Sequence, residues 1–227
     1  EKSPKSVGVA LGSVTRERAR VYGFNFAKWK ASVEDAIAVN YAKLQAGGAR
    51  AAALLAQPTD VRVTAENGTD LRFRLAGESR KPEINDGVIS DDDLAAGNTD
   101  ASLPAGDVWV APIEESAQGA FICDVDIPQV GRLIEGMSWT FQDGHAVEFT
   151  AKRNLAAAQT SWPEATGDRD RFGALGLGIN PRAKPGFLQS TGVSGAVTIG
   201  IGDNRDIGGK NASSYGFAGT LVSGTVE

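Results

Sequence analysis

Carboxylates are the residues best placed for chemistry in this sequence. Asp124 and Asp126 alternate within an apolar stretch, so in a strand both would lie on one face, near Glu114 and Glu115. A group of oxygen ligands of this kind suits Mg²⁺ or Mn²⁺, and a carboxylate-only site stays as one alternative. The acidic run at 91–93 lacks the spaced D-x-D-x-D-G pattern and the closing glutamate of a calcium loop, which predicts an exposed acidic loop.

Histidine is the scarcest chemical group, because His145 is the one histidine in the chain. A site that needs two imidazoles cannot be built within a single chain, which excludes most catalytic zinc sites and the 2-His-1-carboxylate iron site. His145 follows Gly144 in a polar turn, and no serine or cysteine nucleophile motif accompanies it. We therefore expect a solvated turn histidine rather than a general base.

The composition excludes several classes of binding partner. The 227 residues are 41% hydrophobic and 22% charged, with a formal net charge of −5. An acidic balance argues against binding to nucleic acid or to an anionic membrane, and no apolar stretch approaches the roughly 18 residues of a membrane span. The one cysteine, Cys123, excludes a disulfide framework and predicts a buried free thiol. We expect a cytoplasmic protein, although export stays open because a true N-terminus is not seen.

Hydrophobic periodicity predicts helices first and strands afterwards. From residue 24 to residue 57, apolar residues recur every three or four positions, with an expected break at Gly47-Gly48 and an end at Pro58. The period then changes to two in 61–65 and 71–75, and the Asn-Gly between these runs predicts a β-hairpin. Residues 77–105 are rich in Gly, Asp, Ser, Asn and Pro and predict a long irregular connection.

The second half of the chain reads mainly as strands. A short helix is expected at 154–161, and glycine is enriched from residue 171 onward. The predicted fold class is therefore α+β, with an N-terminal helical hairpin packed on a curved, mainly antiparallel sheet. Residues 1–23 are expected to be a leader or linker, and 24–227 one domain. The expected strands are 107–111, 120–127, 134–141, 146–151, 197–201 and 220–226.

Four segments, in order along the chain, resemble the aminopeptidase-T-like metallopeptidases and the related iron-dependent dihydroxypyridine dioxygenases. The resemblance covers roughly residues 25–226 and implies the C-terminal part of that family. The segments are Gly68-Thr69-Asp70-Leu71, the stretch LPAGDVWVAP at 103–112, Ile134-Glu135-Gly136 with TFQDGHAVE at 140–148, and IGIG at 199–202 with GGKNAS at 208–213.

The resemblance implies a pair of divalent metal ions held by glutamate, histidine, tyrosine and aspartate side chains. The acidic ligand of the LPAGDVWVAP segment falls on Gly106 and Asp107, which makes Asp107 a shortened candidate. Most of the other ligand positions carry residues that do not bind metal. Those positions are Ala174 for a glutamate, Val193 and Thr198 for a glutamate and a histidine, the neighbourhood of Arg205 for a tyrosine, and Gly216 and Ala218 for a closing His-x-Asp.

These substitutions predict a protein that is not an enzyme, binds no metal cofactor and serves a structural, self-assembly or binding role. The resemblance also implies a homo-oligomer, at least a dimer. The alternative is a metallo-aminopeptidase or a related hydrolase or dioxygenase, with a metal shared between chains or relocated to Asp107, Asp124 and Asp126. The ligand-binding candidates are Thr69, Asp70, Asp107 and Arg205.

Overall fold

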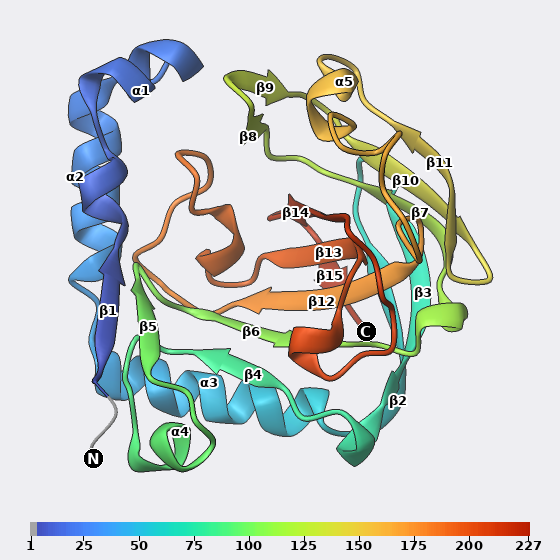
Figure 1. The fold of residues 1–227 in the computed structure, drawn as a ribbon, viewed down its shortest axis with the longest axis horizontal. Coiled ribbons are helices and arrows are strands. Elements are labelled where there is room, and N and C mark those ends of the chain that lie inside the picture. Colours follow the sequence, from blue (N-terminus) through green and yellow to red (C-terminus); the bar gives the residue numbers. More distant parts are fainter. Residues whose placement is uncertain (1–3) are drawn as a thin grey trace.

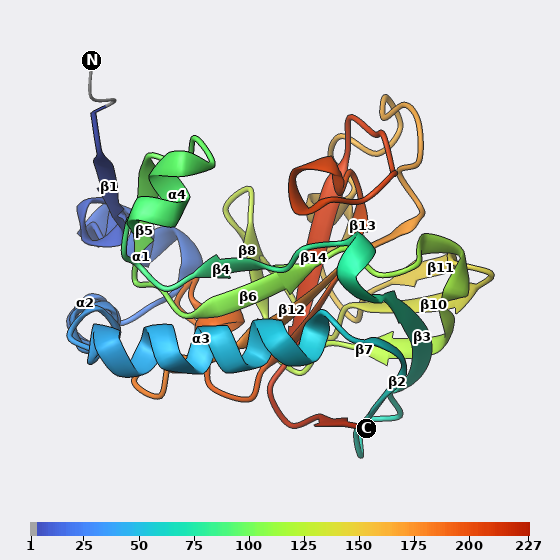
Figure 2. The same ribbon diagram turned by 90° about the horizontal axis from the view of Figure 1, so that it is seen from below.

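The computed structural model describes residues 4–227. Two antiparallel sheets pack against each other, and the helix Tyr41–Leu55 runs along one of them. Two helices that precede it lie together at one side of the molecule (Figure 1 and Figure 2). The expected α+β class, with helices followed by a mainly antiparallel sheet, is confirmed. None of the helices within the described residues has the length and apolar character needed to cross a bilayer.

Three helices make up most of the N-terminal quarter: α1 (Arg16–Tyr22), α2 (Phe26–Ile37) and α3 (Tyr41–Leu55). Each begins after a residue whose side chain accepts a hydrogen bond from the first turn, namely Thr15, Asn25 and Asn40. Before α1, the strand β1 (Ser6–Val9) pairs in parallel with β5 (Asp100–Leu103). Buried Val14 and Ala19 pack in one cluster with Trp29 and Val33 of α2.

The helix break predicted at Gly47-Gly48 is wrong, because α3 continues through both glycines and the break lies at 38–40. Tertiary packing explains the difference. A Cβ on Gly48 would lie 2.6 Å from Cγ2 of Ile84, so the absence of a side chain there lets β4 approach the helix. Asn40 is the signal for the true break, because its Oδ1 accepts from Lys43 N at 3.0 Å.

Between residues 4 and 227, the strands form two large sheets and two small pairs. In the large sheets, every pair of neighbouring strands is antiparallel. The six-stranded sheet has the order β11-β10-β7-β3-β2-β15, with bounds His145–Thr150, Ser138–Gln142, Gln118–Ile122, Asp70–Ala76, Pro58–Thr64 and Thr225–Val226. The five-stranded sheet has the order β14-β13-β12-β6-β4, with bounds Gly216–Leu221, Val197–Gly202, Phe172–Gly178, Asp107–Val110 and Glu83–Asn85. The remaining pair is β8 (Ile127–Gln129) with β9 (Arg132–Ile134).

The β2–β3 hairpin and the turn between β10 and β11 are confirmed, and α5 (Leu155–Ala158) is the expected short helix. The long irregular connection is wrong in part, because 77–105 also contains β4, β5 and α4 (Asp91–Ala95). Ser90 and Asp93 form a capping box that begins α4. The expected strand 134–141 is interrupted, because Gly136 takes a φ of 55° between β9 and β10.

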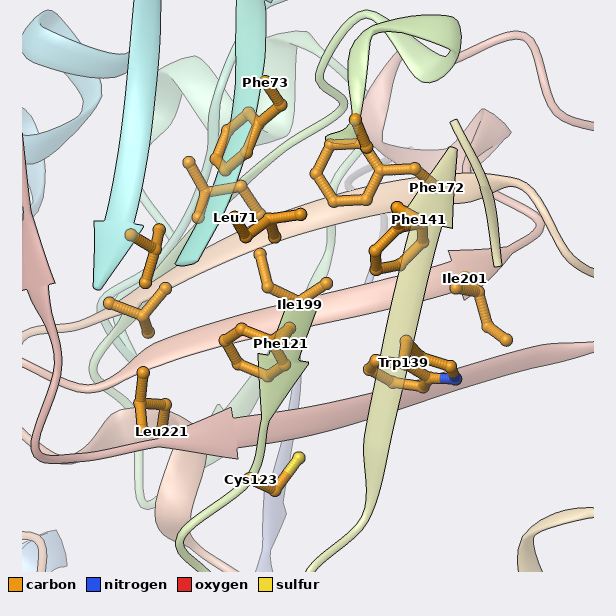
Figure 3. Packing of buried hydrophobic residues seen from close by; sticks show 14 of the residues in the cluster. Leu71, Phe73, Phe121, Cys123, Trp139, Phe141, Phe172, Ile199, Ile201 and Leu221 are labelled. Carbon is orange, nitrogen blue, oxygen red and sulfur yellow. The ribbon is translucent and has the colours of Figure 1, made fainter. Parts of the chain in front are cut away.

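The core lies between the two large sheets (Figure 3). Residues at alternate positions on each strand point inward, so one face of each sheet is apolar. Phe172 of β12 packs against Phe73 of β3 and Phe141 of β10, with ring centroids 5.0 and 5.4 Å apart. Cys123 lies in this core with its thiol free, as predicted.

Candidate functional site

The five-stranded sheet has a second face, turned away from the core. Val197 and Ile199 point into the core, so Thr198 between them points to the other side. Its hydroxyl lies 3.0 Å from that of Thr220 on β14, which places both on this outer face. One row further along, Ala174, Gly200 and Ala218 are cross-strand neighbours on β12, β13 and β14, and they lie on the same face.

The outer face therefore brings together positions that are far apart in sequence. The resemblance equates four of them with metal ligands: Ala174, Thr198, Gly216 and Ala218. Gly216 begins β14 and lies opposite Gly202. Val193 lies before β13, in an isolated bridge with Asn180. On β12, β13 and β14, the side chains of this face are methyl groups and hydroxyls, with glycines between them. On β6, Trp109 lies opposite Gly176, and its ring occupies the space that a Cβ on that glycine would take.

Asp107 begins β6 on the same side of the sheet as these positions, because Val108 and Val110 face the core. Its main chain lies opposite Gly178 on β12. The carboxylate accepts hydrogen bonds from Asn85 Nδ2 at 3.2 Å and from Thr191 Oγ1 at 3.0 Å. Asp107 is 9% exposed, so it is a buried acid held by two neutral donors.

A cavity of about 180 Å³ opens beside Asp107, between α2, the start of β6 and residues 183–192. Figure 1 shows these segments meeting on the side of the molecule where α2 and β5 lie. The walls are mainly apolar, with Trp29 and Val33 from the helix and Phe187 from the loop. Among the residues that line it, Asp107 is the charged side chain.

The two ligand-binding candidates in the β2–β3 hairpin, Thr69 and Asp70, form hydrogen bonds with neighbouring strands. Oγ1 of Thr69 accepts from Ile122 N at 3.0 Å and donates to Ile122 O at 3.3 Å, which joins the hairpin to β7. The Asp70 carboxylate accepts from Arg62 Nε at 2.9 Å and from Nη2 at 2.8 Å. Those hydrogen bonds lower the pKa of Asp70.

Arg205 lies apart from both Asp107 and the hairpin, in the turn Arg205–Ile207 after β13. Its guanidinium is exposed and forms a salt bridge with Asp203. Hydrogen bonds from the Arg205 side chain, followed by those from backbone N–H groups, lower the pKa of Asp203 to about 2. The four ligand-binding candidates are therefore distributed over the hairpin, the start of β6 and this turn.

The acidic residues also lie apart. Asp124 accepts from Val222 N at 2.8 Å and Ser223 N at 2.9 Å, and so holds the chain just after β14. From Asp107 on β6 to this place beside β14, the sheet crosses β12 and β13, so the two lie three strand spacings apart. At ~4.8 Å per spacing this separation is about 14 Å. Within residues 4–227, no group of three or more His, Cys, Asp and Glu side chains is arranged to hold a metal ion.

His145 begins β11, and its Nδ1 lies 2.8 Å from Asp170 Oδ2. The imidazole side chain is 45% exposed, in keeping with the expected solvated histidine. Its partner Asp170 was not recognised from the sequence. The run 91–93 forms the first turn of α4, where acidic side chains favour the positive end of the helix dipole. The spacing Ser90-x-x-Asp93 was the available signal for this helix start.

Sequence reasoning also missed a buried ion pair in the segment that follows β6. Glu114 lies 2.6 Å from Arg80 Nη2, and the two side chains are 5% and 7% exposed. Its other oxygen accepts from Asn204 Nδ2 at 3.1 Å and Lys210 N at 2.7 Å. The pair thus anchors the 203–213 loop to the segments around β6.

The family model for the thermophilic metalloproteases (M29) matches residues 19–167, and the chain belongs to this family. Two solved structures share the fold. AmpT from Thermus thermophilus is 18% identical with a TM-score of 0.68, over 88% of this chain and 54% of its own. 2,5-Dihydroxypyridine dioxygenase from Pseudomonas putida KT2440 is 16% identical with a TM-score of 0.67, over 87% of this chain and 59% of its own. The chain thus spans little more than half of either protein, and no curated protein matches it.

Proposed function

We propose that this chain is a non-catalytic member of the M29 family, in which the metal ligands are lost and the fold serves a structural, self-assembly or binding role. One observation carries the proposal. The positions equated with metal ligands on the outer face are occupied by Ala174, Thr198, Gly216 and Ala218.

Whether a pair of metal ions fits this site depends on the side chains that could act as metal ligands. A hydrolytic site needs several anionic or imidazole ligands, both to hold the ions and to lower the pKa of a bound water. Alanine and glycine offer no side-chain donor, and the hydroxyl of Thr198 is already shared with Thr220. Asp107 is the remaining acidic position, and its oxygens accept from Asn85 and Thr191. A dinuclear metal centre does not fit these residues.

Self-association is the form of the structural role that we favour, with a homodimer as the smallest assembly. The support is the family resemblance together with the intact core between the sheets, since a scaffold can be kept while a site changes. The net charge of −5 disfavours nucleic acid or an anionic membrane as the partner.

Metal content per chain is the direct test. Protein purified without chelator should contain less than about a tenth of a zinc, iron or manganese ion per chain by mass spectrometry. It should also show no turnover of leucyl peptides. Light scattering of the same sample should report a dimer or larger. One or two tightly held ions per chain would overturn the proposal, and an Asp107→Asn variant would then show whether those ions need Asp107.

The second candidate is an enzyme with a relocated or shared metal. The distance between Asp107 and Asp124 argues against one ion bound by both within a chain, because metal–oxygen bonds are only about 2.0–2.6 Å long. A shared site would instead combine Asp107 with carboxylates of another copy. Metal that appears only in the oligomer, together with peptidase or dihydroxypyridine turnover, would favour this candidate.

A further inference from the structure

The cavity beside Asp107 holds two polar groups whose hydrogen-bonding is incomplete. Gln189 is 8% exposed, and its Nε2 donates to Ser32 Oγ at 2.7 Å. Its Oε1 is buried without a hydrogen-bond partner. A buried acceptor of this kind costs about 1–3 kcal/mol when nothing donates to it, so it marks a place where a ligand can contribute a donor.

Asp107 is the second group. Among the described residues, no lysine, arginine or histidine nitrogen lies within 4.0 Å of its carboxylate. Its two donors, Asn85 and Thr191, are neutral. A buried carboxylate is ordinarily paired with a cation, and this one borders open volume instead. Thr191 connects Asp107 to Gln189, because it follows Gln189 by two residues in the chain and its hydroxyl donates to the Asp107 carboxylate.

The walls of the cavity specify the rest of the ligand. Val14, Val33 and Leu103 supply aliphatic surface, and Trp29 and Phe187 supply aromatic rings. Trp29 Nε1 donates to Phe187 O at 3.0 Å, so the aromatic wall is fixed to the loop. Phe187 and Leu188 take positive φ values of 54° and 68°, a backbone conformation that L-residues rarely adopt. Strain of this kind persists at sites that need one loop shape.

We propose that this cavity binds a small aliphatic primary ammonium ion, with its charge at Asp107, a hydrogen bond to Gln189 Oε1 and its hydrocarbon against the apolar walls. An ammonium supplies three hydrogen-bond donors and a positive charge. Gln189 Oε1 lacks a donor, and the Asp107 carboxylate lacks a cation. A divalent cation fits less well, because Mg²⁺ and Ca²⁺ require six or more oxygen ligands and these walls are mainly apolar. At about 30 Å³ per water, the volume of about 180 Å³ has room for about six water-sized groups.

This inference deepens the proposed binding role, and it rests on that role because a metal ion at Asp107 would compete with the ammonium. The test is a titration of the full chain with isobutylammonium, followed by calorimetry or ligand-observed NMR, with and without EDTA. Isobutanol is the matched probe, because it keeps the carbon skeleton and removes the charge. We expect a millimolar Kd for the amine and at least tenfold weaker binding of the alcohol.

Variants then locate the site. Asp107→Asn should weaken amine binding at least tenfold, and Gln189→Met several-fold. Asp60→Asn, at an exposed position on β2, should leave it unchanged and so controls for net charge. In the unsubstituted chain, the amine should also shift the indole N–H signal that a Trp29→Phe variant lacks, a readout independent of any change at Asp107.

Three results would overturn the inference: no binding at about 20 mM amine, equal binding of amine and alcohol, or an unchanged Kd in Asp107→Asn. The metal content of the same preparation separates this failure from failure of the proposed function. Metal-free protein that ignores the amine refutes the ligand alone. Protein that carries stoichiometric metal, but binds the amine through Asp107 once EDTA removes the metal, refutes the non-catalytic role alone.

Discussion

Arg80 and Glu114 form an ion pair that is almost fully removed from solvent, with side chains 7% and 5% exposed and Nη2 to Oε2 at 2.6 Å. The pair joins the end of the β2–β3 hairpin to the segment after β6. Through Asn204 and the Lys210 N–H, it also holds the 203–213 loop that borders the outer face. The shape of that border thus depends on one buried carboxylate.

Removing this carboxylate should destabilise the protein strongly. Glu114→Gln leaves the Arg80 charge buried without its counter-ion, and breaking such a pair typically costs about 3–5 kcal/mol. Asp70→Asn is the matched control, because it removes a carboxylate from the exposed pair with Arg62 and should cost less than about 1 kcal/mol. Urea unfolding of the three proteins measures the difference. Equal losses for the two variants would contradict the assigned role of Glu114.

Lowering the pH should weaken the same ion pair, because it protonates Glu114. Burial alone would raise the pKa of Glu114, but hydrogen bonds from Arg80, the Lys210 N–H and Asn204 outweigh it, so the folded pKa is lowered. The stabilisation is therefore complete above the unfolded pKa of about 4.3 and is lost as the pH falls through the folded value. The difference in unfolding free energy between the unsubstituted protein and Glu114→Gln should be constant above about pH 5 and shrink below about pH 4. A difference that grows in acid would refute the lowered pKa.

Local sequence signals predicted much of the fold. The turn at Asn67-Gly68 and the alternation on both sides of it are short-range features, so the β2–β3 hairpin was predictable. The continuation of α3 through Gly48 was not, because it depends on Ile84, which approaches from another part of the chain. A glycine looks the same in sequence whether it ends a helix or admits a neighbour.

The candidate site was predictable only in part, for the same reason. Asp107 was identified through its motif, but its donor Thr191 is 84 residues away and comes from a loop without a periodic pattern. Gln189 became a candidate only when its burial and its unpartnered oxygen were known. Arg80 and Glu114 likewise look like surface residues until the fold buries them.

Gly144, in the turn between β10 and β11, should not tolerate a side chain. A Cβ there would lie 1.8 Å from the Glu114 carbonyl oxygen, and its φ is 75°. Gly208 provides the control, because its φ is 81° and its Cβ would meet nothing within 4 Å. Gly208→Ala should cost only the conformational penalty of about 1–2 kcal/mol. Gly144→Ala should cost at least about 2 kcal/mol more, since the backbone must move. Similar midpoints in urea would show that the turn adapts.

Cys123 should be unreactive while the protein is folded. Its thiol is buried in the core, and desolvation there, followed by the nearby Asp124 charge, raises its pKa. A thiol reagent needs both access and thiolate, and the folded chain restricts both. Labelling by a chromogenic disulfide at pH 8 should therefore follow the rate of unfolding, with one thiol per chain modified rapidly in denaturant. Destabilised Glu114→Gln should label faster than Asp70→Asn, because it opens more often. Rapid labelling of all these proteins at one rate, without denaturant, would show that the core around Cys123 is open to solvent.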